Sequence, residues 1–527
     1  MSQITVKNLS FHYEGSPDNV FEGVSFQLDT DWKLGFISRN GRGKTTFLRL
    51  LTGAFPYQGE ISAAVDFSYF PFEWDAAAPT ALAAARRAIA PFDEWEAGME
   101  AALADGSEAA LLRYGELQEL MMLNDGYQID ELIAREAGKL QVSPDALMRP
   151  LDTLSLGERT KLQIAALFLR KNQFLLIDEP TNHLDAHGRQ TLERYLAAKR
   201  GFILVSHDRA LLDGVVDHVL SINRATIEVM QGNYSTWQEN RALREQFERK
   251  QNERLGREIS QLTDAMHRTE RWSDAIEATK IGFGAGDRGY IGHQAARMMQ
   301  RAKATERRIG RSIEEKTGLL KDIESAEPLK LTTLPYPKKR LIELSNVQVD
   351  YGQGALFQPL SFSLFQGERV AIAGANGSGK SSLIKLLLGE PVPHTGICRV
   401  GSGLTIAYVS QDTSHLSGIP RDFAQREGID ETLFKTILRK LDFPRREFDR
   451  PMESYSGGQK KKVLLAASLC RPAHLYLWDE PLNFVDILSR VQIETLLCDF
   501  APTMLFVEHD RRFAEAVANR PPIILAR

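Results

Sequence analysis

The amino-acid sequence predicts an α/β fold in which one domain occurs twice, with a long helical segment between the two copies. Three observations support this prediction. The chain has 527 residues, which is too long for a single hydrophobic core. Segments of the N-terminal half recur in the same order in the C-terminal half. Residues 238–278 and 294–327, between the copies, contain few Gly or Pro residues and are rich in Glu, Arg, Gln and Ala, the composition of long exposed helices.

The repeat is visible in sequence and in spacing. Three pairs of segments match: SRNGRGKTT (38–46) with GANGSGKSS (374–382), LSLGERTKLQIAALF (154–168) with YSGGQKKKVLLAASL (455–469), and LIDEPTNHLD (176–185) with LWDEPLNFVD (477–486). Ser155 and Glu179 are 24 residues apart, and so are Ser456 and Glu480. Matching order and spacing indicate a duplication. We predict domains at residues 1–237 and 331–527, joined by a linker at 238–330.

Composition excludes several classes of protein. Hydrophobic residues make up 43% of the chain and charged residues 25%, which is typical of soluble globular proteins. The formal net charge of −4 excludes polyanion binding by bulk electrostatics, so a nucleic-acid contact would need a local basic patch. Three cysteines are too few for a disulfide framework or a zinc site, which fits a reducing compartment.

Membrane targeting is not expected. The first residues, MSQITVKNLSFHY, lack the basic stretch and apolar core of a secretory signal. Apolar runs such as residues 174–177 and 203–205 are short, whereas spanning a bilayer takes roughly 20 residues. We therefore expect no membrane segment and a cytoplasmic protein.

The second copy carries a phosphate-binding loop. Residues 374–381 fit the pattern G-x-x-x-x-G-K-[ST] after an apolar, strand-like run. Glycines allow backbone N–H groups to surround phosphates, Lys380 reaches the β and γ oxygens, and Ser381 ligates magnesium. The sequence therefore predicts ATP and Mg²⁺ as ligands. The predicted nucleotide-binding residues are Gly374, Ala375, Asn376, Gly377, Ser378, Gly379, Lys380, Ser381 and Ser382.

The first copy has the same loop with one change. Ser38 stands where the pattern has glycine, while Lys44 and Thr45 keep their roles. A serine can hold this turn if its φ is negative, so we expect tolerated or weakened geometry with binding retained. The predicted nucleotide-binding residues are Ser38, Arg39, Asn40, Gly41, Arg42, Gly43, Lys44, Thr45 and Thr46, with Thr45 also a metal ligand.

An Asp-Glu pair ends an apolar strand in each copy. Asp178 and Asp479 are predicted to hold magnesium, and Glu179 and Glu480 to act as general bases toward water. An Asp-Glu pair alone is also typical of an ordinary strand end. The Pro that follows in both copies, and a further Asp seven residues after the first, favour the catalytic interpretation.

Histidine and tyrosine complete the predicted sites. His207 and His509 each follow a β-branched strand and are predicted to contact the γ-phosphate; a surface histidine at a strand end is the alternative. Tyr13 and Tyr351 precede the loop lysines by 31 and 29 residues, where an aromatic ring can stack on adenine. A tyrosine packed in a turn remains the alternative for both.

The order of aromatic residue, phosphate loop, LSGGQ-like signature, Asp-Glu pair and histidine resembles the ATP-binding-cassette superfamily over nearly the whole chain. Two cassettes, no membrane domain and a linker of about 90–100 residues resemble the ABC-F subfamily, cytosolic proteins that act on ribosomes. Residues 28–46 and 287–308 look most like the Lsa/Vga-type antibiotic-resistance branch.

The resemblance implies that the cassettes close head to tail around two ATP molecules. Site one would join Lys44, Asp178, Glu179 and His207 to the signature of the second cassette, which comprises Ser456, Gly457, Gly458 and Gln459. Site two would join Lys380, Gln411, Asp479, Glu480 and His509 to the signature of the first cassette, which comprises Ser155, Leu156, Gly157 and Glu158. Gln411 would contact the metal.

Two departures from the family pattern matter. Leu156 replaces the first glycine of the signature that completes site two. Phe72 stands where a magnesium-contacting glutamine is usual, whereas the second copy keeps Gln411. Both glutamates that would act as general bases are present. We predict that both sites bind ATP and that they hydrolyse it slowly and at unequal rates.

The linker is predicted to be an antiparallel helical hairpin. Apolar residues recur at steps of three and four in each half, and the glycines of residues 281–292 supply a turn. The two seams comprise Leu255, Ile259, Leu262 and Met266, and Met298, Ala302, Ile309 and Ile313. A helix of 40 residues reaches about 60 Å.

The far end of this hairpin is basic. From Arg288 to Arg311 there are seven Arg or Lys residues and one acidic residue, Glu306. Such a patch attracts RNA, although charged faces of exposed coiled coils are often simply solvated. The resemblance favours RNA, because tips in this branch enter the ribosomal exit-site region. The predicted contacts, with rRNA and with tRNA as a further candidate, are Phe283, Arg288, Tyr290, His293, Arg297 and Arg301.

The leading hypothesis is an ATPase that binds the bacterial ribosome and displaces lincosamides, pleuromutilins or group A streptogramins, with hydrolysis releasing it. The alternatives are a housekeeping ABC-F translation factor and the ATPase subunit of a transporter. No obligate protein partner is inferred. Lys44 to Ser155 spans 111 residues against 76 for Lys380 to Ser456. The additional residues, in or near 76–110, predict either a short arm or an enlarged helical subdomain.

Overall fold

The computed structural model describes residues 2–14, 19–182, 184–222, 227–279, 297, 300–301, 304–305, 307–312, 314, 316, 329–352 and 354–526. The chain divides into two compact units, Met1–Ser235 with Ala326–Arg527, and Thr236–Ser325. We call the part of the first unit from β1 to β9 the first cassette, and the part from β10 to β17 the second cassette. The predicted boundaries at 237/238 and 330/331 stay predictions.

The first cassette contains a largely parallel six-stranded sheet of order β5-β6-β7-β3-β8-β9, in which only the β8–β9 pair is antiparallel. A smaller antiparallel sheet has the order β2-β1-β4. The strands are β1 (Gln3–Phe11), β2 (Phe21–Asp29), β3 (Lys33–Ile37), β4 (Gln58–Ser62), β5 (Asp66–Phe70), β6 (Gln173–Asp178), β7 (Phe202–Val205), β8 (His218–Ile222) and β9 (Ile227–Gln231).

The second cassette repeats this plan. Its parallel five-stranded sheet has the order β14-β15-β16-β12-β17, and its antiparallel sheet has the order β11-β10-β13. The strands are β10 (Arg340–Val349), β11 (Leu360–Phe365), β12 (Arg369–Ala373), β13 (His394–Val400), β14 (Ile406–Val409), β15 (Leu475–Asp479), β16 (Met504–Val507) and β17 (Ile523–Ile524). The tandem α/β architecture predicted from the repeat is confirmed.

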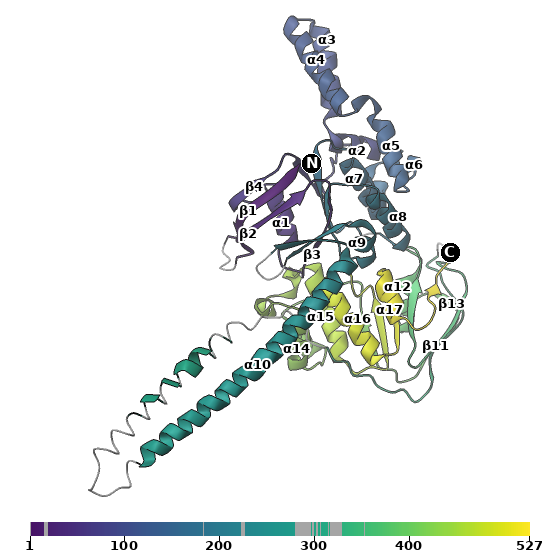
Figure 1. Ribbon diagram of the computed structural model, residues 1–527. Coiled ribbons are helices and arrows are strands. Elements are labelled where there is room, and N and C mark those ends of the chain that lie inside the picture. Colours follow the sequence, from purple (N-terminus) through teal and green to yellow (C-terminus); the bar gives the residue numbers. More distant parts are fainter. Residues whose placement is uncertain are drawn as a thin grey trace. The chain divides into compact units, whose positions relative to one another are not determined.

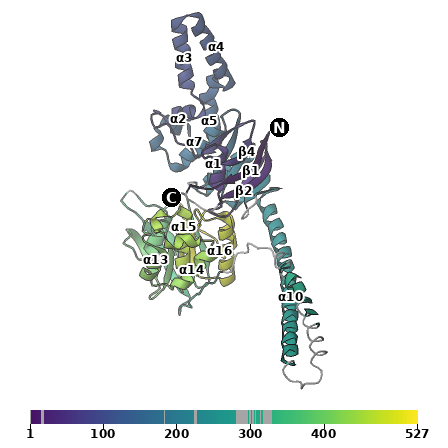
Figure 2. The same ribbon diagram turned by 90° about the vertical axis from the view of Figure 1, so that its left-hand side faces the viewer.

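Each cassette also contains helices, most of which flank its parallel sheet (Figures 1 and 2). In the first cassette they are α1 (Lys44–Leu51), α2 (Ala81–Ile89), α3 (Phe92–Asp105), α4 (Glu108–Leu123), α5 (Ile129–Lys139), α6 (Pro144–Met148), α7 (Leu156–Leu167), α8 (Ala186–Ala197) and α9 (Arg209–Val215). In the second they are α12 (Lys380–Leu387), α13 (Pro420–Arg426), α14 (Glu431–Lys440), α15 (Gly457–Cys470), α16 (Ile487–Phe500) and α17 (Arg511–Val517). Short 3₁₀ segments include Arg445–Asp449.

The central strands consist of apolar residues because both faces of each parallel sheet are covered. β7 and β16 are buried at all four of their positions, and β15 at all five. In parallel α/β sheets, ligands bind beyond the carboxyl ends of the strands. The loops that follow β3, β6, β12 and β15 carry the predicted phosphate loops and Asp-Glu pairs, so the fold places them at the same sheet edge.

The additional residues of the first cassette form an arm. Helices α3 and α4 lie side by side as a hairpin that extends away from the sheets of this cassette (Figures 1 and 2). Gly106, with φ of 65°, ends α3, and the Ser107 hydroxyl caps α4 by accepting from Ala110 N. Phe92 and Met121 are buried at the base of the hairpin, whereas Leu112 is 69% exposed. Of the two alternatives left open by the sequence, the structure has the arm.

The second unit contains most of α10 (Tyr234–Thr279), a helix of 46 residues. Residues 307–312 are also helical, and the Lys316 ammonium forms an ion pair with Glu258 of α10, as an antiparallel hairpin requires. The seam residues of α10 and Ile309 are partly buried. Met298, Ala302 and Ile313 lie outside the described residues, as do the predicted tip residues Phe283, Arg288, Tyr290 and His293. Arg297 and Arg301 are exposed.

Among the residues described, no helix is both long enough and apolar enough to cross a membrane.

Candidate nucleotide-binding sites

Both phosphate loops end at a position that only glycine can occupy. Gly43 and Gly379 adopt φ of 90° and 88° immediately before α1 and α12. A Cβ on Gly43 would lie 2.6 Å from Val20, and one on Gly379 would lie 3.1 Å from Leu356. The turn and the lack of space both require glycine at these positions. Each loop thereby presents its N–H groups at a helix N-terminus, the usual position for phosphate.

The loop lysines occupy matching positions. Lys44 Nζ donates to Ser38 O at 2.9 Å, and Lys380 Nζ donates to Gly374 O at 2.9 Å and to Ala375 O at 3.0 Å. Burial lowers the pKa of both ammonium groups. Ser38 does not adopt a positive φ, and its hydroxyl donates to Arg39 O. The serine is therefore accommodated in the turn, as expected.

The two predicted general bases share an unusual backbone conformation. Glu179 and Glu480 adopt φ of 51° and 47°, a region that non-glycine residues rarely occupy. Their N–H groups donate to Val205 O and Val507 O of the neighbouring strands. These bonds fix the backbone where each strand ends, so the strained conformation holds both carboxylates in equivalent positions.

In site two, Glu480 lies in a polar network. Its Oε2 accepts from Gln411 Nε2 at 2.9 Å and from Asn483 Nδ2 at 2.6 Å, and its Oε1 lies 3.3 Å from His509 Nε2. Burial acts to raise the pKa of Glu480, but the His509 hydrogen bond and the charges of His509 and Lys380 lower it below its usual value. The carboxylate is therefore held ionised.

In site one, the corresponding glutamate has a less polar environment. Glu179 Oε1 lies 3.3 Å from His207 Nε2, and Glu179 Oε2 accepts from His207 N at 3.4 Å. Burial, followed by the charge of Asp178, raises the pKa of Glu179 to about 8, although the charge of Lys44 opposes this shift. Burial also lowers the pKa of His207.

Phe72, at the position of the usual glutamine, does not face the phosphate loop. Its ring lies 5.0 Å from that of Trp74 and 5.2 Å from the guanidinium of Arg170, while its carbonyl accepts from Gln163. The hydroxyl of Tyr69 donates to Asp178 Oδ2 at 2.9 Å instead, and so does that of Thr45 at 2.8 Å. Site one therefore lacks the glutamine but has a tyrosine on its Asp.

Site two is completed by the first cassette. A cavity of about 780 Å³ is lined by the second phosphate loop, including Lys380 and Ser381, by Gln411, Glu480 and His509, and by Ser155, Leu156, Gly157 and Glu158. The head-to-tail assembly inferred from the family resemblance is therefore present here. Leu156 is 59% exposed. Tyr351 is not among the described residues that line this cavity; its hydroxyl donates to Ser382 Oγ at 3.3 Å.

Site one is completed by the second cassette. Asn40 Nδ2 donates to Phe484 O at 2.8 Å, and a Cβ on Gly458 would lie 2.9 Å from Asn40 Nδ2. The second signature thus packs on the first phosphate loop. A cavity of about 680 Å³ is lined by residues 40–46, Tyr13, Asn19, Val20, Ile222 and Pro444–Arg446. Tyr13 is held by its hydroxyl, 2.6 Å from Thr46 Oγ1.

Both signatures begin a helix with the same cap. Ser155 Oγ accepts from Glu158 N at 3.2 Å, and Ser456 Oγ accepts from Gln459 N at 3.3 Å. The side chains of Glu158 and Gln459 accept in return from the serine N–H groups. These capping boxes fix the N-termini of α7 and α15 where they face the opposite phosphate loop.

The donor sets suit ATP with magnesium. Thr45 with Asp178, and Ser381 with Asp479 and Gln411, are oxygen ligands of the kind that Mg²⁺ prefers. Asp479 Oδ1 is buried without a hydrogen-bond partner, and burial raises the pKa of this carboxyl. A cation beside Asp479 would pair with the Oδ1 atom and compensate the negative charge of the carboxylate. It would also neutralise charge on the phosphates of bound ATP.

Comparison with known families decides the identity of these domains. The family model described as ABC transporter matches residues 21–182 and 357–483, which is more than half of the chain and includes both phosphate loops. The chain belongs to the ABC transporter family.

Individual relatives of this ABC protein align over nearly its full length. The ribosome protection protein VmlR of Bacillus subtilis is 27% identical over 99% of this chain and 86% of its own. The energy-dependent translational throttle protein EttA of Escherichia coli K12 is 27% identical over 95% of this chain and 88% of its own. These are ABC-F proteins, so the resemblance to that subfamily is confirmed, and the chain is an ATPase.

Solved structures share the fold. The archaeal ribosome recycling factor aABCE1 aligns with 98% of this chain and 86% of its own at a TM-score of 0.56 and 17% identity. The RNase-L inhibitor aligns with 98% of this chain and 87% of its own at a TM-score of 0.55 and 19% identity. These likenesses concern the fold alone.

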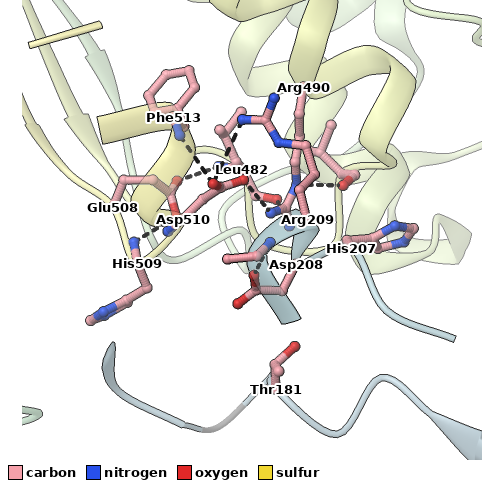
Figure 3. A network of polar contacts seen from close by, with 12 residues as sticks. Thr181, His207, Asp208, Arg209, Leu482, Arg490, Glu508, His509, Asp510 and Phe513 are labelled. Carbon is pink, nitrogen blue, oxygen red and sulfur yellow. Dashed lines mark hydrogen bonds and ion pairs between the residues drawn. The ribbon is translucent and has the colours of Figure 1, made fainter. Parts of the chain in front are cut away.

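Sequence reasoning missed the polar interface between the cassettes of this ABC protein. Arg209, next to Asp208 at the start of α9, lies 2.6 Å from Glu494 Oε2 and 3.6 Å from Asp510 Oδ1 of the second cassette (Figure 3). Arg490 Nη1 lies 3.2 Å from Asp510 Oδ2. Asp510 is fully buried. Its place directly after His509 was the available signal, because a buried carboxylate requires cationic partners.

A second missed contact joins the second cassette to the start of α10. Arg512, three residues after His509, forms an ion pair with Asp213, and its Nη2 donates to Ser235 Oγ at 3.2 Å. The Asp213 carboxylate also accepts from Ser235 N at 2.7 Å, which caps the first turn of α10. The segment that carries His509 is thus bonded to the base of the long helix.

Proposed function

We propose that this ABC-F ATPase binds the bacterial ribosome in its ATP-bound form and displaces antibiotics from the peptidyl-transferase centre. The drug classes are lincosamides, pleuromutilins and group A streptogramins. Hydrolysis of ATP releases the protein. The protein acts in the cytoplasm, and its linker tip contacts rRNA, with tRNA as a further candidate, near the exit site. The proposal is supported by the similarity to VmlR, a ribosome protection protein that aligns with 99% of this chain.

The observation that carries the proposal is the α10 helix, which begins at Tyr234 and is 46 residues long. Its first turn is bonded through Asp213 and Ser235 to Arg512, close to the histidine of site two. A helix of this length reaches roughly 70 Å. Arg297 and Arg301, which are exposed, belong to the basic part of the linker. In this proposal, a change at an ATP site acts on α10, and the basic part of the linker contacts RNA.

The ATP sites work as a pair in this proposal. Lys44 and Lys380 bind the β and γ phosphates, and Mg²⁺ is held by Asp178 and Thr45 in site one. In site two, Asp479, Ser381 and Gln411 hold it. Glu179 and Glu480 orient and deprotonate the attacking water, and His207 and His509 contact the γ-phosphate. The signatures close each site from the opposite cassette.

Binding and drug protection are tested separately. The Glu179→Gln, Glu480→Gln protein is incubated with ribosomes and ATP and sedimented through sucrose; we expect co-sedimentation that depends on ATP. Minimum inhibitory concentrations of the three drug classes are then compared in a susceptible strain with and without the wild-type protein, using Lys44→Ala, Lys380→Ala as the inactive control. A rise of several-fold with the wild type alone supports protection. Absence of ribosome binding would refute the proposal.

A second candidate is a translation factor without drug protection. The α3–α4 arm and the similarity to EttA, a translational throttle protein, favour this alternative. The candidates separate in the same experiments. ATP-dependent ribosome binding with unchanged drug sensitivity, together with altered translation of a reporter by the trapped variant, would favour the translation factor. A transporter subunit would bind no ribosomes at all.

A further inference from the structure

The second cassette contributes more than its signature to site one. Pro444, Arg445 and Arg446 lie on the wall of the site-one cavity, together with residues 40–46 of the phosphate loop and Tyr13. Arg445 and Arg446 begin the 3₁₀ segment Arg445–Asp449, which follows α14. This segment is separate from the signature, which begins at Ser456, and no motif of the sequence pointed to it.

The segment is fixed in place on both sides. On one side, Arg39 of the phosphate loop lies 3.6 Å from Asp442 Oδ2, and the Arg39 side chain is only 9% exposed. On the other side, buried Glu447 lies 3.6 Å from Arg446 Nε, and its carbonyl accepts from the Tyr455 hydroxyl. Because Asp442 and Glu447 flank the two arginines, the backbone of residues 444–446 is held against the first cassette.

The charges of the two cavities differ. Among the described residues that line the site-one cavity none is acidic, and four are basic: Arg42, Lys44, Arg445 and Arg446. The lining of the site-two cavity mixes the acids Glu158, Asp185 and Glu480 with the bases Lys161, Arg189, Lys380 and His509. A cavity with cations on both walls suits a polyanion, and guanidinium groups bind phosphate and stack on bases more effectively than ammonium groups.

We propose that Arg445 and Arg446 bind the ATP of site one from the opposite cassette, at its α-phosphate and nucleoside. The phosphate loop and Lys44 surround the β and γ phosphates, whereas Tyr13, Asn19, Val20 and Ile222 line the outer part of the same cavity. The arginine pair is specific to this site. Arg445 and Arg446 precede Ser456 by 11 and 10 residues, and the matching residues before Ser155 are Pro144 and Asp145. Neither is among the described residues that line the site-two cavity.

The test measures nucleotide affinity at one site at a time in the full-length protein. Lys380→Ala disables site two, and binding of a non-hydrolysable ATP analogue to site one is followed by equilibrium dialysis. We expect Arg445→Ala, Arg446→Ala to weaken binding by about tenfold or more, as two charged hydrogen-bond donors are lost. Arg445→Lys, Arg446→Lys should recover part of the affinity. Arg450→Ala, in the next turn and paired with Glu447, is the matched control and should leave affinity unchanged.

The same substitutions are then made with Lys44→Ala, which leaves site two to bind. In this background we expect the double arginine variant to bind the analogue as the parent does. Unchanged affinity in the Lys380→Ala background would overturn the proposal. So would an equal loss in both backgrounds, because that result would mean that the segment merely supports the fold. The inference depends on the ATP sites and not on ribosome binding, so either can fail without the other.

Discussion

The two ATP sites share one backbone frame but differ in the side chains around it. In both, a buried strand ends in an Asp-Glu pair whose Glu has a positive φ and whose carboxylate lies 3.3 Å from a histidine. In site two, Gln411 and Asn483 donate to that glutamate. In site one, Phe72 packs on Trp74 and does not face the phosphate loop, and burial raises the pKa of Glu179 to about 8. Duplication preserved the frame, and a few substitutions made the sites unequal.

The interface between the cassettes is unequal as well. Arg209 bonds across the interface to Glu494, whereas its counterpart Arg511 pairs with Glu515 of its own helix. Arg511 is 76% exposed, and the Arg209 side chain is 5% exposed. A close ion pair is therefore formed on one side of the interface, whereas on the other side Arg511 and the matching Glu193 interact only through their charges. The lesson is that sequence symmetry between the cassettes does not extend to their contacts.

The largest effect is expected from the general-base glutamates, which both sites have. Replacing Glu179 and Glu480 together by Gln should lower the rate of ATP turnover roughly 10³-fold, since general-base catalysis typically contributes 10²–10⁴-fold. Steady-state phosphate release measures it. The single variants then report the remaining site: Glu179→Gln leaves site two and Glu480→Gln leaves site one. Equal residual rates would contradict the inequality of the two sites, whereas a faster site two would support it.

The interface asymmetry gives the next largest effect. Arg209→Ala leaves the buried Asp510 and the partly buried Glu494 without one partner, and breaking a buried pair costs about 3 kcal/mol or more. Arg511→Ala removes an exposed pair that is worth less than about 1 kcal/mol. We expect Arg209→Ala to lower the thermal unfolding temperature and ATP-dependent ribosome binding, and Arg511→Ala to change neither measurably. Similar effects for both would contradict the observed asymmetry.

A third difference lies where α5 and α14 pack on their cassettes. Glu136 accepts from Lys199 at 2.6 Å and from the Tyr195 hydroxyl at 2.8 Å, whereas the second cassette has the buried Ile437 at the position of Glu136 and Leu496 at that of Tyr195. Burial acts to raise the pKa of Glu136, but these hydrogen bonds and that of Lys139 lower it to about 2. The packing of α5 in the first cassette therefore depends on pH, whereas the matching packing of α14 in the second cassette is apolar.

Glu136→Gln should consequently destabilise the first cassette by about 2 kcal/mol at pH 7, because charged hydrogen bonds are lost. The folded pKa is below the unfolded one, so the wild type holds this stability above the usual pKa of a glutamate. It loses it as pH falls from about 4.5 toward 2. Chemical denaturation at several pH values should show the two proteins converging in acid. Glu131→Gln, exposed on the same helix, serves as the control.

The smallest effect concerns the glutamine that only site two has. In a Glu179→Gln background, Gln411→Ala should lower phosphate release from site two by about tenfold, since a hydrogen bond that positions a charged group contributes about 1.5 kcal/mol. Tyr69→Phe, in a Glu480→Gln background, tests the substitute in site one and should lower the rate there by less. A larger loss with Tyr69→Phe would reverse the assigned order of the two groups.

The amino-acid sequence was sufficient to predict the two phosphate loops, the Asp-Glu pairs, the signatures and the helical linker. These features depend on short-range geometry: a glycine required by φ near 90°, a capping serine three residues before its partner, an apolar strand before a carboxylate. Their residues are neighbours in the chain, so spacing is sufficient to predict them. The turn at Ser38 agrees with its prediction, because it required only that φ not be positive, and retained nucleotide binding at this loop stays a prediction.

The family resemblance implied that each signature faces the opposite phosphate loop, but the other contacts between the cassettes became known only from the three-dimensional structure. Arg209 and Glu494 are 285 residues apart, and Asn40 and Phe484 are 444 apart, so no local pattern links them. The packing of Phe72 on Trp74 and the place of Arg445 beside the first phosphate loop likewise depend on how whole helices pack. Hydrophobic burial and buried ion pairs act through space, and the two copies therefore acquired different sites from nearly the same pattern of motifs.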